Sequence, residues 1–228
     1  KSYKERKKQG NPTYAAMIKA LDDNVGRLIN HLKQTGTYDN TLIIFVSDNG
    51  GLSTAEGSST SNLPLAKGKG WMYEGGIRVP YIIKPPQLKK ASVINMPVSG
   101  VDFFPTIMGY ANNSANVPAI DGMNLKPFIE GGKVANERPL FWHYPHYANQ
   151  GGNPASVIRL GDFKLIHDLE LDVYELYNLK SDIGETKNLV TALPEKTAEL
   201  KAMLNTWIAK NYNKKLEPNP NWNGNDLK

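Results

Sequence analysis

A short stretch of the chain holds the residues whose types and spacing could do chemistry. Asp48 and Asn49 follow a continuous apolar run, residues 41 to 46, and are themselves followed by Gly50 and Gly51. The run is rich in β-branched residues, which is typical of a strand covered on both faces in an α/β sheet. Side chains at the carboxyl end of such a strand face a crevice, and carboxylate and amide oxygens are ligands for hard cations. We therefore expect a metal site at Asp48 and Asn49.

Two lysines, Lys67 and Lys69, follow this strand end after a polar loop, residues 52 to 63, and stand among glycines. Glycines beside a lysine let the backbone approach an anion, while the ammonium supplies a point charge. On composition alone, an oxyanion site and a merely flexible loop are equally consistent with this pattern. Glu74 and Arg78 lie in a glycine-rich segment that we expect not to be helical, where they predict an ion pair that braces the turn.

The elements on either side of this stretch predict an α/β fold. Asn11 followed by Pro12 predicts the start of a helix that ends near Gly36. Its apolar residues recur every three or four positions, so we expect one face of this helix to pack on the sheet. A second strand is expected over residues 79 to 83 and a short apolar helix over residues 101 to 111.

A change of composition predicts a second unit. Residues 112 to 138 are rich in Asn, Gly and Pro without sustained periodicity, so we place one unit at residues 1 to 137 and another at residues 138 to 228. In the second unit, short apolar runs flank the turn dipeptide Gly161-Asp162 and predict a small antiparallel sheet. The apolar face of residues 194 to 212 predicts a helix packed with that sheet.

Composition excludes several classes of site and partner. The 228 residues include no cysteine, so this segment has no disulfide, no thiolate metal site and no cysteine nucleophile. Much of the net charge of +5 lies in the first eight residues, which we interpret as a solvated arm and not as a nucleic-acid patch. No apolar run is long enough for a membrane span. The first residues read as the interior of a longer polypeptide.

Several motifs together carry a family resemblance. They are DNTLIIFVSDNGG at 39 to 51, GKGWMYEGGIRVP at 68 to 80, VSGVDFFPTI at 98 to 107, IRLGDFKLI at 158 to 166 and ELYNL at 175 to 179. In this order and spacing they resemble the C-terminal portion of type I sulfatases, the formylglycine-dependent branch of the alkaline phosphatase superfamily. The resemblance implies an alkaline-phosphatase-like sandwich with a mostly parallel or mixed central sheet, followed by a small C-terminal subdomain.

The resemblance also assigns roles. It implies that Asp48 and Asn49 bind a divalent cation, usually Ca²⁺, and that Lys69 contacts the sulfate, whereas Lys67 has no direct role. It implies that a formylglycine hydrolyses an aryl sulfate or a sulfated sugar in the periplasm or outside the cell. The nucleophile motif, Cys or Ser followed by x-Pro-x-Arg, does not occur in this sequence. We therefore expect the N-terminal part of the same polypeptide to supply it, and this chain alone to be inactive and to bind metal weakly.

Two histidines are candidates for contact with the substrate. His143 and His146 lie in the aromatic run WHYPHY, residues 142 to 147, where they suit either sugar contact or aromatic packing between the two units.

A phosphomonoesterase or phosphonate hydrolase of the same superfamily could share the metal ligands, although those enzymes generally lack the K-G-x-x-Y-E-G-G arrangement. A non-catalytic glycan-binding module with a decayed site is the other alternative, and the intact Asp48, Asn49 and Lys69 argue against it.

Overall fold

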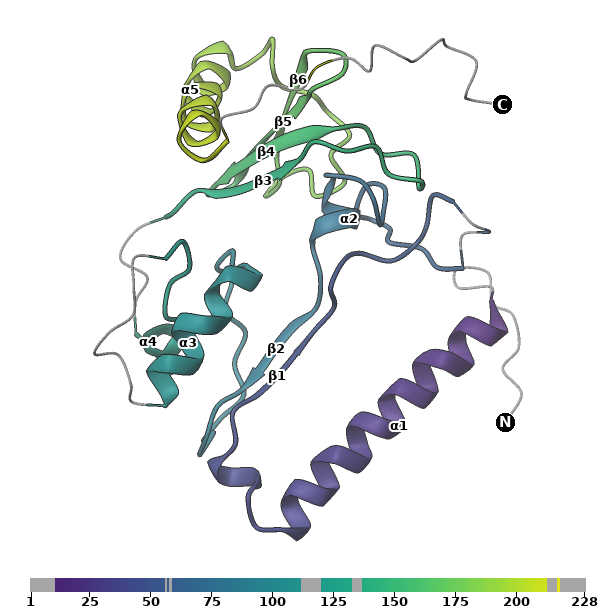
Figure 1. Ribbon diagram of the computed structural model, residues 1–228, viewed down its shortest axis with the longest axis vertical. Coiled ribbons are helices and arrows are strands. Elements are labelled where there is room, and N and C mark those ends of the chain that lie inside the picture. Colours follow the sequence, from purple (N-terminus) through teal and green to yellow (C-terminus); the bar gives the residue numbers. More distant parts are fainter. Residues whose placement is uncertain are drawn as a thin grey trace.

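The computed structural model describes residues 11–55, 57, 59–111, 120–132, 137–212 and 217 of the chain (Figure 1). The basic arm at the N-terminus and nearly all of the tail after Tyr212 therefore lie outside the described residues, as does part of the expected boundary between the two units. No helix in the described part of the chain is both long and apolar enough to cross a membrane.

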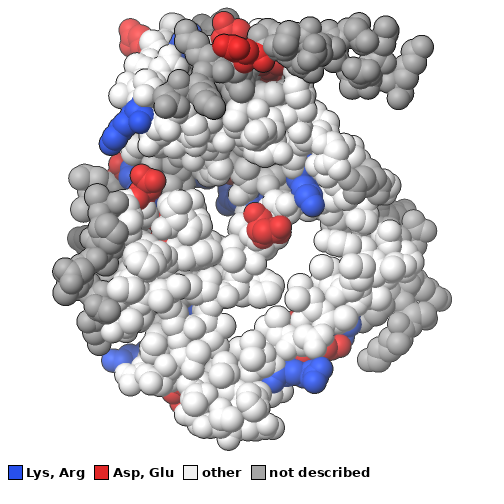
Figure 2. Space-filling model, in the orientation of Figure 1, with Lys and Arg blue, Asp and Glu red and all other residues white. Residues whose placement is uncertain are grey.

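The first helix, α1 (Pro12–Gln34), begins where the sequence predicts, because the Asn11 side chain accepts a hydrogen bond from the Tyr14 amide at 2.9 Å. The expectation that it packs on a sheet is wrong for the residues that the structure describes. None of its residues is buried, and Leu28 is 57% exposed. Figures 1 and 2 show open space between α1 and the strands that follow it. No described residue thus covers its apolar face.

The strand before Asp48 pairs with the next strand along the chain. β1 (Ile43–Val46) and β2 (Tyr81–Lys84) form an antiparallel pair in which Ile43 lies opposite Lys84. The parallel pairs of the expected central sheet are not among the described residues. A single turn of 3-10 helix, η1 (Tyr38–Asn40), leads into β1.

Short helices follow β2. The 3-10 turn η2 (Gly100–Asp102) continues into α3 (Phe103–Tyr110), as the sequence predicts, and α4 (Lys126–Ile129) comes next. The ring of Phe103 stacks on that of Tyr81 at 5.2 Å, so α3 is fixed against β2.

The C-terminal part is an antiparallel sheet with a helix, as predicted. Its strands lie in chain order, β3 (Leu140–Tyr144), β4 (Ala155–Leu160), β5 (Phe163–Asp168) and β6 (Val173–Asn178). Gly161 and Asp162 form the turn between β4 and β5, with Gly161 at a φ of 56°. One face of the sheet packs against α5 (Pro194–Asn211), whose Leu200 and Leu204 are fully buried.

The opposite face of this sheet carries the segment that follows the two lysines. Met72 and Tyr73 pack there against a core that includes Val157 and Ile166. The segment ends in α2 (Glu74–Ile77), a one-turn helix, so the expectation of a non-helical segment is wrong. The turn forms despite its two glycines because the Arg78 amide donates to the Glu74 carbonyl at 2.8 Å and the sheet supports it from one side.

Candidate active site

Asp48 and Asn49 lie directly after β1, where the chain leaves the sheet. Asp48 is exposed, and its Oδ1 accepts hydrogen bonds from the Asn49 amide at 3.0 Å and from Asn49 Nδ2 at 3.3 Å. Asn49 Nδ2 also donates to the Gly50 carbonyl. Among the described residues, Asp48 Oδ2 and Asn49 Oδ1 have no hydrogen-bond partner. Two hard oxygens are therefore available from adjacent residues.

The backbone beyond this pair lies directly on α2. The Gly50 amide donates to the Gly76 carbonyl at 2.8 Å. A Cβ on Gly50 would lie 1.7 Å from the Gly75 carbonyl oxygen, so only glycine fits at this contact. The glycines of the strand end and of α2 thus let two backbones touch.

The loop that carries Lys69 is joined to the same strand end. The Lys69 amide donates to the Gly51 carbonyl at 3.1 Å, and Asn62 Nδ2 donates to the same carbonyl at 2.7 Å. Asn62 Nδ2 also lies 3.0 Å from the Lys67 carbonyl, which in turn accepts from Ser53 Oγ at 2.9 Å. Asn62 therefore ties the polar loop to the Lys67 carbonyl and to the Gly51 carbonyl that the Lys69 amide also binds. Nothing in the sequence distinguishes it from the other polar residues of that loop.

The two lysines differ in their surroundings. Lys67 has a left-handed backbone, with a φ of 59°, and its Nζ lies 4.6 Å from the centre of the Trp71 ring. Lys69 is exposed, and its ammonium has no hydrogen bond, ion pair or ring contact within the described part of the chain. Of the two lysines, Lys69 is therefore the one whose ammonium has no partner among the described residues.

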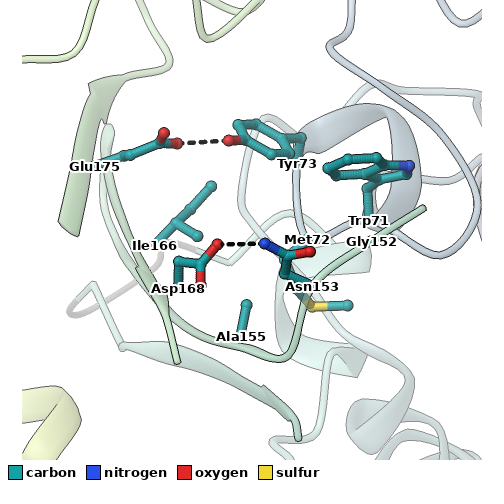
Figure 3. A pocket seen from close by; sticks show the side chains of 9 residues that line it. All are labelled: Trp71, Met72, Tyr73, Gly152, Asn153, Ala155, Ile166, Asp168 and Glu175. Atoms are coloured by element: carbon teal, nitrogen blue, oxygen red, sulfur yellow. Dashed lines mark hydrogen bonds between the residues drawn. The ribbon is translucent and has the colours of Figure 1, made fainter. Parts of the chain in front are cut away.

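The residues after Lys69 hold this loop against the C-terminal sheet (Figure 3). The Tyr73 hydroxyl donates to Glu175 at 2.6 Å, and Trp71 Nε1 donates to the Gln150 carbonyl at 3.0 Å. Burial, followed by the bond to Glu175, raises the pKa of Tyr73 well above its usual range. A cavity of about 50 Å³ remains between these residues and the sheet, where Asn153 donates to Asp168 at 2.9 Å. Tyr73 therefore serves as a permanent donor in this contact.

The predicted ion pair between Glu74 and Arg78 is present, with Arg78 Nη1 3.6 Å from Glu74 Oε2. Glu74 is nevertheless buried and has further cationic neighbours on the C-terminal sheet, Arg159 and Lys164. The sequence gives no sign of these contacts, because the partners are far apart along the chain.

The two histidines lie in different places. His143 is in β3, where its Nδ1 lies 2.8 Å from Ser156 Oγ and its ring lies 4.2 Å from that of Tyr212, which follows α5. Its neighbour Phe141, which points to the same face, packs in the cluster under α5. The structure therefore places His143 on the α5 face of the sheet, away from the face that carries residues 71 to 77.

His146 is exposed and precedes a loop that reaches the lysine segment. In that loop, the Gln150 carbonyl also accepts a hydrogen bond from Thr54 at 3.3 Å. A Cβ on Gly70 would lie 2.9 Å from the Ala148 side chain. The structure thus brings the loop of His146, but not His143, next to the loop of Lys69.

The residues present suit a hard cation but supply few ligands. Asp48 and Asn49 offer carboxylate and amide oxygens, whereas Ca²⁺ takes six to eight oxygens. No group of three or more His, Cys, Asp or Glu side chains that could hold a metal occurs in the described residues. This arrangement fits one side of a metal site.

Comparisons with known proteins agree with this geometry. The family model for sulfatases matches residues 1–113, and the model described as N-sulphoglucosamine sulphohydrolase, C-terminal, matches residues 67–214. A sulfatase from Formosa agariphila is 38% identical over 223 residues, covering 87% of this chain and 40% of that protein. The N-acetylglucosamine-6-O-sulfatase of Bacteroides thetaiotaomicron is 36% identical, covering 77% of this chain and 31% of that protein. The chain thus spans less than half of the curated relatives that it matches.

Solved structures show the same fold. The crystal structure of Ps i-CgsB in complex with k-i-k-neocarrahexaose matches with a TM-score of 0.74 at 30% identity, over 89% of this chain and 44% of that one. A protein crystallised with its substrate D-glucosamine-2-N,6-O-disulfate matches with a TM-score of 0.68 at 32% identity, over 86% of this chain and 40% of that one. The phosphonate monoester hydrolase of Silicibacter pomeroyi matches with a TM-score of 0.64 at 25% identity, over 83% of this chain and 39% of that one.

The C-terminal family model covers more than half of the chain, and its limits include both the lysine segment and the sheet against which that segment packs. The strand end, the K-G-x-x-Y-E-G-G segment and the four-stranded sheet with its helix occur together, in the order that the resemblance implies. This chain therefore belongs to the sulfatase family of the alkaline phosphatase superfamily, and it matches the C-terminal portion of that family.

Proposed function

We propose that this chain forms one side of the active site of a sulfuric ester hydrolase that acts on sulfated glycans. One observation carries the proposal. The Lys69 amide is bonded to the Gly51 carbonyl, so the free ammonium and the oxygens of Asp48 and Asn49 are borne by one hydrogen-bonded backbone unit. A cation and an ammonium held together in this way suit a tetrahedral oxyanion.

The roles of this chain's residues follow from their chemistry. Asp48 and Asn49 hold a divalent cation, which when bound supplies Lewis-acid stabilisation of the sulfuryl oxygens. Lys69 binds another oxygen of the same group and neutralises the charge that gathers there in the transition state. Lys67 remains over the Trp71 ring and keeps the backbone of its loop in place.

The nucleophile, a formylglycine, and the remaining metal ligands come in this proposal from a preceding part of the same polypeptide. Two features support such a partner. The relatives are more than twice as long as the matched region, and the face of α1 exposes Met17 and Leu21 beside Leu28. The folded state becomes more stable when another element covers the apolar face of an amphipathic helix. This chain alone is therefore expected to hydrolyse nothing and to bind Ca²⁺ with a dissociation constant above about 1 mM.

The proposed substrate is a sulfated sugar. Two relatives point to this class, one by its name and one by its bound glucosamine disulfate. Of the two histidines predicted as sugar contacts, His146 has the geometry that supports contact, because its loop adjoins that of Lys69. For His143, the bond to Ser156 favours packing. A location in the periplasm or outside the cell accords with such substrates.

A phosphonate or phosphate monoester hydrolase is the second candidate, favoured by the structural match to a phosphonate monoester hydrolase. The complete enzyme that contains this chain separates the two candidates when it is assayed on the sulfate, phosphate and phenylphosphonate esters of 4-nitrophenol. We expect the highest kcat/KM for the sulfate ester, and loss of that activity in Asp48→Ala. Higher kcat/KM for the phosphate or phosphonate ester would contradict the proposal.

A further inference from the structure

A lysine is fully buried in the C-terminal sheet, on the face that carries α2. Lys164 has no exposed surface and lies in β5, opposite Arg159 on β4 and Tyr177 on β6. Buried ammonium groups are stable only when they are paired and hydrogen-bonded. Lys164 Nζ lies 2.7 Å from Glu185 Oε1 and 3.2 Å from Glu74 Oε1, and both carboxylates are buried. The lysine therefore joins two acidic residues from different segments.

Glu185 holds α2 by a second bond. Its Oε2 accepts a hydrogen bond from the Glu74 amide at 2.6 Å, so one carboxylate binds both Lys164 and the first residue of the helix. Burial raises the pKa of Glu185, and the Lys164 ammonium opposes that shift. Glu185 also has a φ of 51°, a left-handed conformation that a non-glycine residue keeps only when its surroundings fix it.

Glu74 has cations beside both of its carboxylate oxygens. Arg159 Nη1 and Arg78 Nη1 each lie 3.6 Å from Glu74 Oε2, the oxygen that does not face Lys164. Two cations of the sheet, Lys164 and Arg159, thus meet two buried carboxylates, Glu74 and Glu185. Loss of one partner would leave a charge in a place that water does not reach, which is strongly destabilising.

Through α2, this cluster reaches both parts of the proposed site. The Gly76 carbonyl accepts from the Gly50 amide at 2.8 Å, directly after the metal pair. The Gly75 amide donates to the Ala66 carbonyl at 2.8 Å, in the loop that leads to Lys69. These contacts are between backbones, with no room for a Cβ at Gly50 or Gly75, so a shift of α2 must move both loops.

We propose that Lys164, together with Glu185, is a positioning residue: it clamps Glu74 at the start of α2 and thereby sets the metal pair and Lys69 at their mutual distance. The structural half of this inference stands on its own, whereas its catalytic half rests on the proposed function. Both side chains are buried, so in this proposal neither touches the substrate or the cation. Their effect is carried by the backbone of α2.

The test compares Lys164→Met with a matched control, Leu204→Ala. Leu204 is equally buried but lies on α5, across the sheet from α2, so its loss weakens the same sheet without touching the cluster. Hydrogen exchange of the Gly50, Lys69 and Gly75 amides is measured in this chain. We expect Lys164→Met to accelerate exchange at these amides by roughly 100-fold, and Leu204→Ala to affect mainly the sheet and α5.

A readout in the complete enzyme distinguishes positioning from stability alone. Lys164→Met should raise the Ca²⁺ concentration for half-maximal activity by about tenfold, as changes behind metal ligands do, whereas Leu204→Ala should leave it unchanged. The double variant Lys164→Met/Glu185→Gln should recover part of both effects, because it removes the uncompensated carboxylate. If Lys164→Met does not fold, Glu185→Gln alone should give a smaller acceleration at Gly75.

The inference is overturned if Lys164→Met, or Glu185→Gln in its place, leaves the exchange at Gly50, Lys69 and Gly75 unchanged, or if Leu204→Ala accelerates it equally. Failure of the proposed function has a different signature. In that case the complete enzyme has a higher kcat/KM for the phosphate or phosphonate ester than for the sulfate ester, while the exchange of these amides in this chain still responds to Lys164→Met.

Discussion

Lys67 and Lys69 are two residues apart in a loop where either lysine could bind an anion, yet their surroundings differ. The Trp71 ring lies under the Lys67 ammonium, and that residue's left-handed backbone turns the chain. Lys69 leaves its ammonium in solvent while its amide is bonded to Gly51. Composition alone leaves an anion site and a flexible loop equally consistent at this position, and the family resemblance selects Lys69 over Lys67. The contacts show a further difference between the two lysines that the sequence does not reveal, because the Trp71 ring pairs with Lys67 only.

His146 and His143 give a prediction for substrate binding. In the complete enzyme, His146→Ala should raise KM for a sulfated oligosaccharide by up to about tenfold, the factor that corresponds to the loss of one hydrogen bond. It should leave KM for 4-nitrophenyl sulfate unchanged. His143→Ala should change neither KM by much, because Ser156 is its partner. Equal effects of His146→Ala on both substrates would remove sugar contact as its role.

The pKa of His143 predicts a dependence of stability on pH. Burial, with a smaller contribution from His146, lowers this pKa below 6.5. Because the folded state then takes up the proton less readily than the unfolded state, its stability is full above about pH 6.5 and falls as the pH drops through the folded-state pKa.

Urea unfolding at about pH 7.5 and about pH 5 checks this dependence. His143→Gln, which cannot titrate but can still bond to Ser156, should lose less unfolding free energy between the two pH values than the unchanged chain. An equal loss in both proteins would show that His143 is not the group responsible.

At the scale of elements, α2 is the point where the strand end, the lysine loop and the C-terminal sheet meet. A Cβ at Gly50 would lie 1.7 Å from the Gly75 carbonyl oxygen, so Gly50→Ala should lower the free energy of unfolding by about 3 kcal/mol or more. A Cβ at Gly26, in the middle of α1, would meet no atom of another described element within 4 Å, and Gly26→Ala should raise helix stability by about 0.5 to 1 kcal/mol.

Chemical denaturation of Gly50→Ala, Gly26→Ala and the unchanged chain compares their free energies of unfolding. A tolerated Gly50→Ala, with unfolding free energy equal to that of the unchanged chain, would contradict the close contact between the strand end and α2.

Elements with local signals could be predicted from the sequence, and elements made by distant contacts could not. The Asn11 cap, the Gly161-Asp162 turn and the apolar face with Leu200 and Leu204 each carry a local cause. The turn of α2 has two glycines and poor helix propensity, so its contacts with the sheet and the bond from its first amide to Glu185 explain it. Lys164 reads as an ordinary strand lysine, because alternation predicts its face but not that two carboxylates cover it.

At the scale of the whole molecule, open space lies beside α1, so the described residues do not form a closed domain around this helix (Figure 2). The sequence predicts the apolar face of α1 correctly, and no described residue covers that face. In the complete enzyme that we propose, further polypeptide covers it, and the relatives do extend well beyond the matched region.

The open space beside α1 predicts that a substitution on its apolar face affects the stability of this chain and of the complete enzyme differently. Leu28 is 57% exposed in this chain, so Leu28→Gln should change its unfolding free energy by no more than about 0.5 kcal/mol. In the complete enzyme, where we propose that another element covers α1, the same change should lower stability by about 2 kcal/mol or more. An equally small effect in both contexts, measured by urea unfolding, would show that this face stays uncovered.

The central claim is that Lys69 and the pair Asp48 and Asn49 hold the same sulfuryl group. The most direct measurement is kcat/KM of the complete enzyme for 4-nitrophenyl sulfate, with Lys69→Met and Lys67→Met compared at saturating Ca²⁺. We predict a loss on the order of 100-fold to 1,000-fold for Lys69→Met and less than about tenfold for Lys67→Met. Equal losses in the two variants, or a Lys69→Met enzyme that retains full activity, would contradict it.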